Sequence, residues 1–290
     1  MTAKNSSIGT VGTIKTNIQK ESQKASNSHL MEIMTRIGYA ARGLIYITMG
    51  ILAVQVAMGK GGTLASPQGA IAAIGKQPAG LVLLWIILIG LVSYSLWGVV
   101  RAVFDPLHKG TDMKGLLARF GFLVSAFGYA IMVMPTYGYI TGSSQSASGS
   151  QTQKLISSVM AMPLGRWAIG ILGLIVLAAG LYQIYLGVSA GFDRQFKTYA
   201  LTPKEAKLAT DVGRFGTAAR GVVLALVGFL ISLAAYQANP GQPIGMDTAL
   251  ATLLHQPYGI WLLGIVAVGL IAFGFYSMLS ALWFRLRTQG

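Results

Sequence analysis

The sequence predicts an all-α membrane protein whose six transmembrane helices form three tandem helical-hairpin repeats in a pseudo-threefold arrangement. Three observations predict this fold class. Hydrophobic residues make up 53% of the 290 residues and charged residues 10%, which is more apolar surface than one soluble core can bury. The apolar residues form six long runs, and two short motifs recur three times along the chain.

The six runs are long enough to be transmembrane helices, because about 20 residues at 1.5 Å each cross a hydrocarbon layer of about 30 Å. They cover residues 37–58, 79–103, 117–140, 164–191, 215–237 and 258–284. Residues 1–31 are instead rich in Ser, Asn, Lys and Gln and contain no continuous apolar stretch. We therefore predict a polar tail there, and no cleavable signal peptide.

The two recurring motifs divide the chain into three units. Each odd-numbered run begins with Arg-x-Gly, at Arg36, Arg119 and Arg214, and each even-numbered run begins with Pro-x-Gly, at Pro78, Pro163 and Pro257. The arginine and the proline of one unit are 42, 44 and 43 residues apart. This near-constant spacing predicts hairpin repeats over residues 32–107, 115–194 and 210–287, copied in one orientation within one integrated membrane domain.

A short helix is expected just before each proline. Ser66 followed by Pro67 is typical of a helix start, with serine as N-cap and proline at the first helical position. Asp247 is the expected N-cap in the third unit, and residues 151–162 have similar apolar spacing in the second.

The basic residues are distributed unevenly along the chain, whose net charge is +14. Eighteen of the 22 Lys and Arg residues lie in the N-terminal tail and first-helix start, in the 101–119 and 194–220 connections, and at the C-terminus. By the positive-inside rule, both termini are expected in the cytoplasm and the three hairpin tips outside. Membrane topology thus accounts for the charge, and no nucleic-acid partner is expected.

The pattern R-x-G-x-A-A-R-G in the first span and P-x-G in the second resembles the bacterial integral-membrane domain-of-unknown-function family 1206, from residue 36 to about residue 285. Unit two departs from this pattern, because Ser125 stands where units one and three have Arg42 and Arg220. The resemblance implies a multi-pass protein of tandem two-helix repeats in the bacterial plasma (inner) membrane. It implies no activity.

Arg42 and Arg220 lie about 9 Å deeper along their helices than the motif arginines. Such a side chain can snorkel back to the headgroups, or it can pair with a carboxylate at a neighbouring helix end, such as Asp105 or Asp193. It can also help to hold a lipid phosphate or a carboxylate ligand bidentately. The candidate anion or lipid-headgroup site comprises four residues: Arg42, Arg220, Arg36 and Arg214.

Several catalytic and metal sites are excluded by position. The G-x-S-x-G pattern at 187–191 lies near a cytoplasmic helix end, whereas His255 lies on the outer side, too far to act as its base. The three histidines have no ligand spacing and there is no cysteine, so we expect no metal and no cofactor. No acidic residue falls in the middle of a span, which argues against a proton or cation pump.

These observations favour a non-catalytic structural or lipid/anion-interacting membrane module over an enzyme. The alternative is a small channel or facilitator for a neutral or anionic solute, which needs a polar path between the repeats. The expected partners are membrane lipids, together with a second copy of the chain or another membrane protein.

Overall fold

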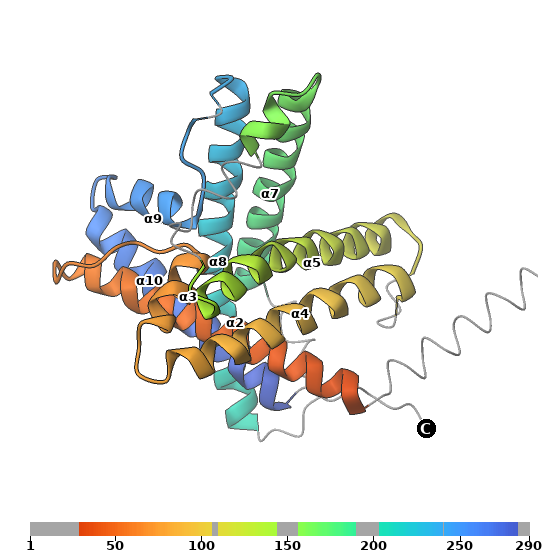
Figure 1. The fold of residues 1–290 in the computed structure, drawn as a ribbon, viewed down its shortest axis with the longest axis vertical. Coiled ribbons are helices and arrows are strands. Elements are labelled where there is room, and N and C mark those ends of the chain that lie inside the picture. The colour runs from red at the N-terminus through yellow and green to blue at the C-terminus, as the bar shows by residue number, and fades with distance from the viewer. Residues whose placement is uncertain (1–28, 106–109, 144–155, 190–202, 240, 284–290) are drawn as a thin grey trace, which may run out of the picture.

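The computed structural model describes residues 29–105, 110–143, 156–189, 203–239 and 241–283, and this part of the chain contains helices and no strand (Figure 1). Six helices are long and apolar enough to cross a membrane: α2 (His29–Ala57), α4 (Gly80–Phe104), α5 (Met113–Ile140), α7 (Gly165–Val188), α8 (Pro203–Tyr236) and α10 (Gly259–Trp283). They confirm the six predicted spans. Residues 1–28 of the predicted tail lie outside the described residues, and α2 begins at its end.

The long helices pack as three pairs that radiate from a common centre (Figure 1). The second span of each unit packs against the first span of the next: α4 on α5, α7 on α8, and α10 back on α2. This cyclic pairing confirms the pseudo-threefold arrangement. It also shows that the most extensive packing lies between units.

Glycines bring the two helices of each pair together. A Cβ added to Gly98 would lie 2.7 Å from the Cβ of Ala126, where α4 meets α5. At Gly43 it would lie 2.7 Å from the carbonyl oxygen of Gly274 between α2 and α10, and at Gly180 it would lie 2.4 Å from a backbone nitrogen of α8. Close backbone approach at small residues is the usual means of helix association in membranes.

The two spans of one unit also pack together in units one and three, as α2 with α4 and α8 with α10. Their contacts are glycine contacts too, because Gly90 faces Ala41 and Gly269 faces Ala219. Unit two has Val124 and Ile175 at the corresponding positions, and α5 and α7 are not a packed pair. The larger side chains prevent the same close approach, so this unit is open.

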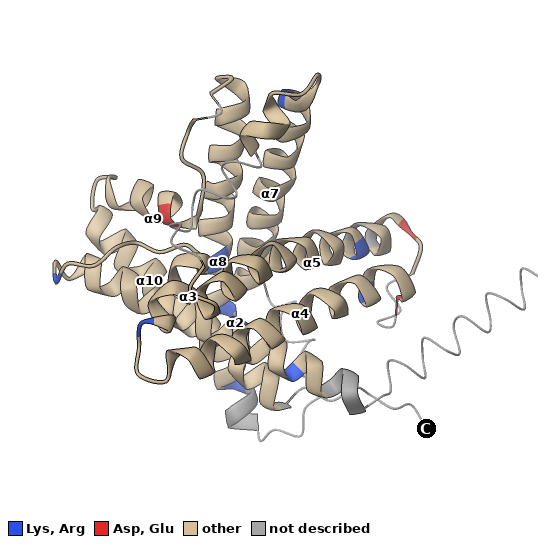
Figure 2. Ribbon diagram, in the orientation of Figure 1, with Lys and Arg blue, Asp and Glu red and all other residues tan. Residues whose placement is uncertain are grey.

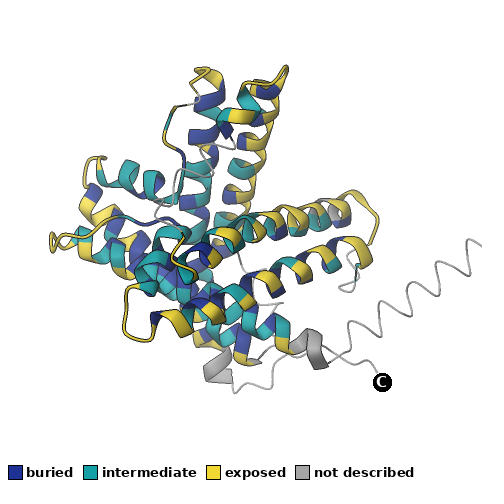
Figure 3. Ribbon diagram, viewed as in Figure 1, coloured by how far each residue is buried: buried dark blue, intermediate teal, exposed yellow. Residues whose placement is uncertain are grey.

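The open unit leaves α5 and α7 more exposed than the other long helices, as the yellow stretches in Figure 3 show. Only 17% of the residues in their apolar windows are buried, against 44% for the other four spans. Their outward side chains are apolar, as suits contact with lipid or with another membrane helix.

The motif glycine of the first span makes this difference testable. At Gly216 an added Cβ would lie 2.3 Å from the backbone nitrogen of Phe273, whereas at the equivalent Gly121 no atom lies within 4 Å. Gly216→Ala is therefore expected to lower the free energy of unfolding by about 1–3 kcal/mol. Gly121→Ala should lower it by less than about 0.5 kcal/mol. Thermal unfolding in detergent, followed by circular dichroism, compares the two variants, and equal losses would contradict the open second unit.

The Pro-x-Gly motif is explained by a tight turn before each even-numbered span. The middle residue is in the left-handed region in all three copies, with φ of 64° at Ala79, 64° at Leu164 and 61° at Tyr258. The glycine N–H donates to the residue three positions earlier, at 2.8 to 2.9 Å. Proline second and a positive φ third define a type II turn, so the motif specifies the reversal into the span.

The short helices agree in part with expectation. Ser66 caps α3 (Pro67–Gly75) by accepting a hydrogen bond from the Gly69 N–H at 3.3 Å, as predicted. The N-cap of α9 (Met246–Leu254) is Gly245, so the prediction of Asp247 as N-cap is wrong. The carboxylate of Asp247 lies in the first turn of α9, where it interacts favourably with the positive end of the helix dipole. In unit two residues 156–160 are helical, and 151–155 lie outside the described residues.

Candidate functional site

The arginine of the Arg-x-Gly motif binds the end of the neighbouring helix. Arg119 donates from Nε and Nη2 to the carbonyl oxygens of Ala102 and Val103, at 2.7 and 2.8 Å, in the last turn of α4. Arg214 makes the same two bonds to the last turn of α7, at 3.1 and 2.6 Å. The last carbonyls of a helix have no partner within it, so these guanidinium groups satisfy them. The motif arginine thus joins consecutive units.

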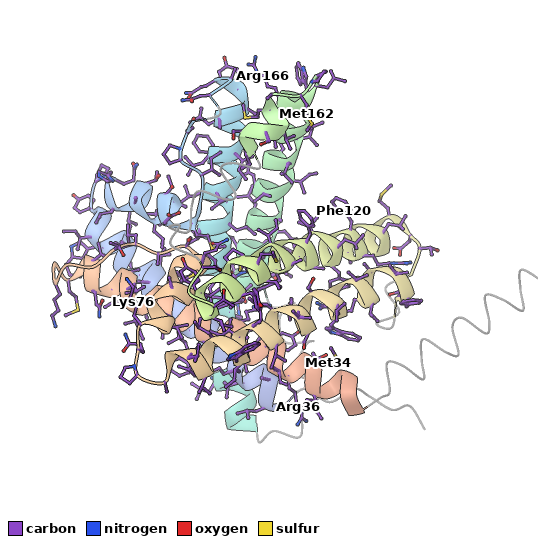
Figure 4. The ribbon with its side chains drawn as sticks, in the orientation of Figure 1. Met34, Arg36, Lys76, Phe120, Met162 and Arg166 are labelled. Carbon is purple, nitrogen blue, oxygen red and sulfur yellow. The ribbon has the colours of Figure 1, made fainter. Side chains whose placement is uncertain are left out.

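Two further arginines lie away from the centre. Arg166, at the tip of α7, donates to the carbonyl oxygens of Ala235 and Tyr236 at the end of α8 (Figure 4). Arg36 lies on the first turns of α2, towards the opposite end of the molecule in this view. The repeat assigns Arg36 to the last turn of α10, by analogy with Arg119 on α4 and Arg214 on α7. The four predicted anion-site residues therefore do not form one site, because Arg214 caps α7 and Arg36 lies near the start of α2.

Arg42 lies within the packed helices. Its Nη1 donates to the Tyr94 hydroxyl at 3.1 Å, and its Cζ lies 4.3 Å from the centroid of the Phe273 ring. Its Nε is buried and has no hydrogen-bond partner. The guanidinium lies among aromatic rings, so it does not snorkel to a surface.

The carboxylates suggested as partners of Arg42 are elsewhere. Asp105 ends α4, and its Oδ2 accepts a hydrogen bond from the Gly110 N–H at 2.8 Å. Asp193 lies outside the described residues. Within the parts of the chain that the structure describes, Arg42 has no ion-pair partner, and its charge faces rings and hydroxyl groups.

Arg220 approaches the same ring from another helix. Its Nε donates to the Tyr46 hydroxyl at 2.9 Å, and its Nη1 donates to the side-chain oxygen of Gln183 on α7. Its Cζ lies 5.1 Å from the Phe273 centroid. The repeat-equivalent residues Arg42 and Arg220, 178 positions apart in the sequence, therefore share one aromatic ring.

A third arginine, Arg101, belongs to the same region and was not among the predicted site residues. It is only 7% exposed, and its Cζ lies 5.3 Å from the Tyr94 centroid and 4.6 Å from that of Phe122. Its Nε and Nη2 are buried without a hydrogen-bond partner. The sequence contains a signal for Arg101, because a charged residue at position 101 falls inside the predicted span 79–103.

We call Arg42, Arg101 and Arg220 the arginine cluster. Arg42 and Arg220 share the Phe273 ring, and Arg42 and Arg101 share the Tyr94 ring. Figure 2 shows blue segments near the centre, where the helices converge, as well as at helix ends and loops. No carboxylate of the described ranges pairs with the cluster. Cation–π contacts of about 0.5–2 kcal/mol each offset part of the cost of burying these charges but do not neutralise them.

The residues of the G-x-S-x-G pattern lie elsewhere. Ser189 ends α7 and directs its hydroxyl to the carbonyl oxygen of Leu186, and His255 ends α9 with Nδ1 2.7 Å from the carbonyl oxygen of Ala251. Among the described residues, no three His, Cys, Asp or Glu side chains group as metal ligands would. The arrangement at the centre can attract and hold an anion, because it presents charge and unused N–H donors.

Comparisons with known proteins agree with the repeat. The family model for Domain of Unknown Function (DUF1206) matches residues 37–105, 120–190 and 215–283, one match in each unit. Uncharacterized protein YxxB of Bacillus subtilis (strain 168) is 32% identical over 248 residues, which cover 86% of this chain and 89% of that protein. No solved structure shows a significant match. The three matched regions confirm the three tandem copies.

Proposed function

The chain belongs to the DUF1206 family, and we propose that it is a non-catalytic module of the bacterial plasma membrane that binds an anionic group at the arginine cluster. It crosses the membrane six times and has both termini in the cytoplasm. Six helices of sufficient length and the distribution of Lys and Arg support this placement.

One observation carries the binding proposal: the guanidinium groups of buried Arg101 and of half-buried Arg42 and Arg220 have no countercharge in the described part of the chain, and three of their nitrogens are buried without a partner. These are Nε of Arg42 and both Nε and Nη2 of Arg101. Buried polar groups in proteins are almost always hydrogen-bonded, and an exception calls for an unseen ion or water. An anion would accept these hydrogen bonds and neutralise part of the charge, which a water molecule does not do.

The absence of catalysis is supported by what surrounds the cluster. Its neighbours are the phenol rings of Tyr46 and Tyr94, the ring of Phe273 and the amide of Gln183. Guanidinium groups remain protonated, so they do not act as general bases. These groups can bind and orient an anion, and binding is the function we assign.

Native mass spectrometry of the protein extracted in mild detergent tests this function. The wild type is expected to retain a defined anionic lipid or small molecule that Arg42→Gln/Arg220→Gln loses, with occupancy falling by about tenfold or more, since each charged hydrogen bond contributes about 1.5–3 kcal/mol. The charge-matched control is Lys60→Gln/Lys76→Gln, because both lysines are exposed.

Equal retention by the wild type, the arginine variant and the lysine control would contradict an anion site at the cluster. Anion flux into vesicles reconstituted with the wild type, abolished in the arginine variant, would instead favour the facilitator. The bound mass in the first measurement identifies the chemical class of the ligand.

A further inference from the structure

The repeat relates the positions of Arg42, Ser125 and Arg220, each six residues after the motif arginine of its unit. Arg42 lies over Tyr94, with Cζ 6.0 Å from the ring centroid, and Arg220 lies over Phe273 at 5.1 Å. Tyr94 and Phe273 are themselves equivalent, since each is 16 residues after the proline of its own unit. The two arginines therefore occupy the same place in their units.

Arg42 also lies over the equivalent ring of the unit that precedes it in the cycle, Phe273 at 4.3 Å. Applied to unit two, this relation places an arginine at position 125 over Tyr94 of unit one. Position 125 is a serine and cannot reach that ring with a charge. The second guanidinium over Tyr94, besides that of Arg42, belongs to Arg101, whose Cζ lies 5.3 Å from the ring centroid.

Arg101 reaches this place from the helix that packs on unit two. It extends from α4, and its Cζ lies 4.6 Å from the ring of Phe122 on α5. Phe122 and Ser125 are three residues apart on one helix, which places them on the same face. Arg101 therefore covers the face of α5 that carries Ser125, which is the face on which the equivalent helices α2 and α8 carry Arg42 and Arg220.

We infer that Arg101 supplies the guanidinium that the repeat lacks at Ser125, and that Arg42, Arg101 and Arg220 together bind the phosphate group of one anionic ligand. The inference rests on the proposed anion site and adds to it a third binding residue and the class of ligand. Arg101 is the strongest member of the set, because two of its buried nitrogens have no partner.

The number of donors favours a phosphate group over a carboxylate. Guanidinium is a planar fork with five N–H donors, and one fork can satisfy both oxygens of a carboxylate. Three forks on three different helices, α2, α4 and α8, supply more donors and more charge than two oxygens in one plane can use. A tetrahedral phosphate group offers oxygens in several directions and suits such a site.

The test measures the binding of inorganic phosphate and of acetate by calorimetry in dodecyl maltoside micelles, which contain no phosphate. Arg101→Gln is expected to weaken phosphate binding by about tenfold or more. In Arg101→Gln/Ser125→Arg the guanidinium returns at the position that the repeat assigns to it. This variant is expected to bind phosphate within about threefold of the wild type, since the charge and the fork are restored.

A second arm distinguishes the source of the phosphate group. Phosphatidylglycerol is added to the same micelles and its retention is measured by native mass spectrometry. Retention by the wild type and the double variant, with loss from Arg101→Gln, identifies a lipid headgroup. Binding of inorganic phosphate with the same ranking of variants, and no selective lipid retention, identifies a free phosphate compound.

Three results would overturn the inference while leaving the proposed function intact. The first is unchanged binding in Arg101→Gln alongside loss in Arg42→Gln/Arg220→Gln. The second is no recovery in Arg101→Gln/Ser125→Arg at an unchanged unfolding temperature, and the third is acetate binding as tight as phosphate binding. If the double variant does not fold, Arg101→Lys must bind phosphate more tightly than Arg101→Gln, and equal binding overturns the inference. No binding of any anion by the wild type removes the proposed function as well.

Discussion

Replacing Gly259 by alanine is expected to lower the free energy of unfolding by at least about 3 kcal/mol, the top of the usual range for an overpacked site. The added Cβ would lie 1.9 Å from the carbonyl oxygen of Leu254 and 2.7 Å from that of Leu253. These are backbone atoms at the end of α9, so no side-chain rotation relieves the clash. The turn that starts α10 would have to open, with loss of the hydrogen bond from the Gly259 N–H to Gln256.

Gly264→Ala is the matched control, since Gly264 lies five residues further along the same helix and has no atom within 4 Å of an added Cβ. Unfolding temperatures of both variants in detergent, followed by circular dichroism, measure the difference. Similar temperatures for the two variants would show that the Pro-x-Gly turn is not the rigid element described above.

Arg101→Met is expected to change stability in the opposite direction. Without ligand, this variant should have a free energy of unfolding about 1–3 kcal/mol higher than the wild type, because a buried cation with two unpartnered nitrogens is removed. Methionine fills the space with a flexible apolar side chain that makes favourable contacts with aromatic rings such as Tyr94 and Phe122. A substitution that raises stability and abolishes phosphate binding is typical of a residue that is retained for function.

Arg119→Met is the comparison. Arg119 binds the last carbonyls of α4, so its replacement should lower the free energy of unfolding. Chemical unfolding in detergent is measured for both variants with and without inorganic phosphate. Phosphate should stabilise the wild type and leave Arg101→Met unchanged. A loss of stability in Arg101→Met comparable to that in Arg119→Met would make Arg101 a structural residue.

Much of the fold could be predicted because it depends on properties that are local in the sequence. A helix of membrane-spanning length is recognisable from its apolar residues alone, and all six were found. The Pro-x-Gly motif is equally local, since proline and a following residue with positive φ specify a turn of four residues. Asp247 was misplaced by two positions as an N-cap, and helix ends are the least certain part of such predictions.

The candidate site depends on contacts between residues far apart in the chain, and the sequence does not show which of them are neighbours. Arg42 and Arg220 were selected by their depth in the spans, yet only the fold shows that Phe273 lies beside both. Arg214 has the same residue type and a similar sequence context but ends in a helix cap. The charge distribution assigns Arg101 to the 101–119 connection, because position along the chain does not show which way a side chain points.

The sequence by itself determined the number of spans, the three copies and their common orientation, because hydrophobic length and motif spacing are read along one helix at a time. Only the tertiary structure decided which helices pair across units, that the second unit is open, and that three arginines meet at aromatic rings. The pairing across units follows from close backbone approach at Gly43, Gly98 and Gly180. The open second unit follows from Ile175, which stands where the other units have Gly90 and Gly269. Charges that are far apart in the chain become neighbours only when that packing brings their helices together.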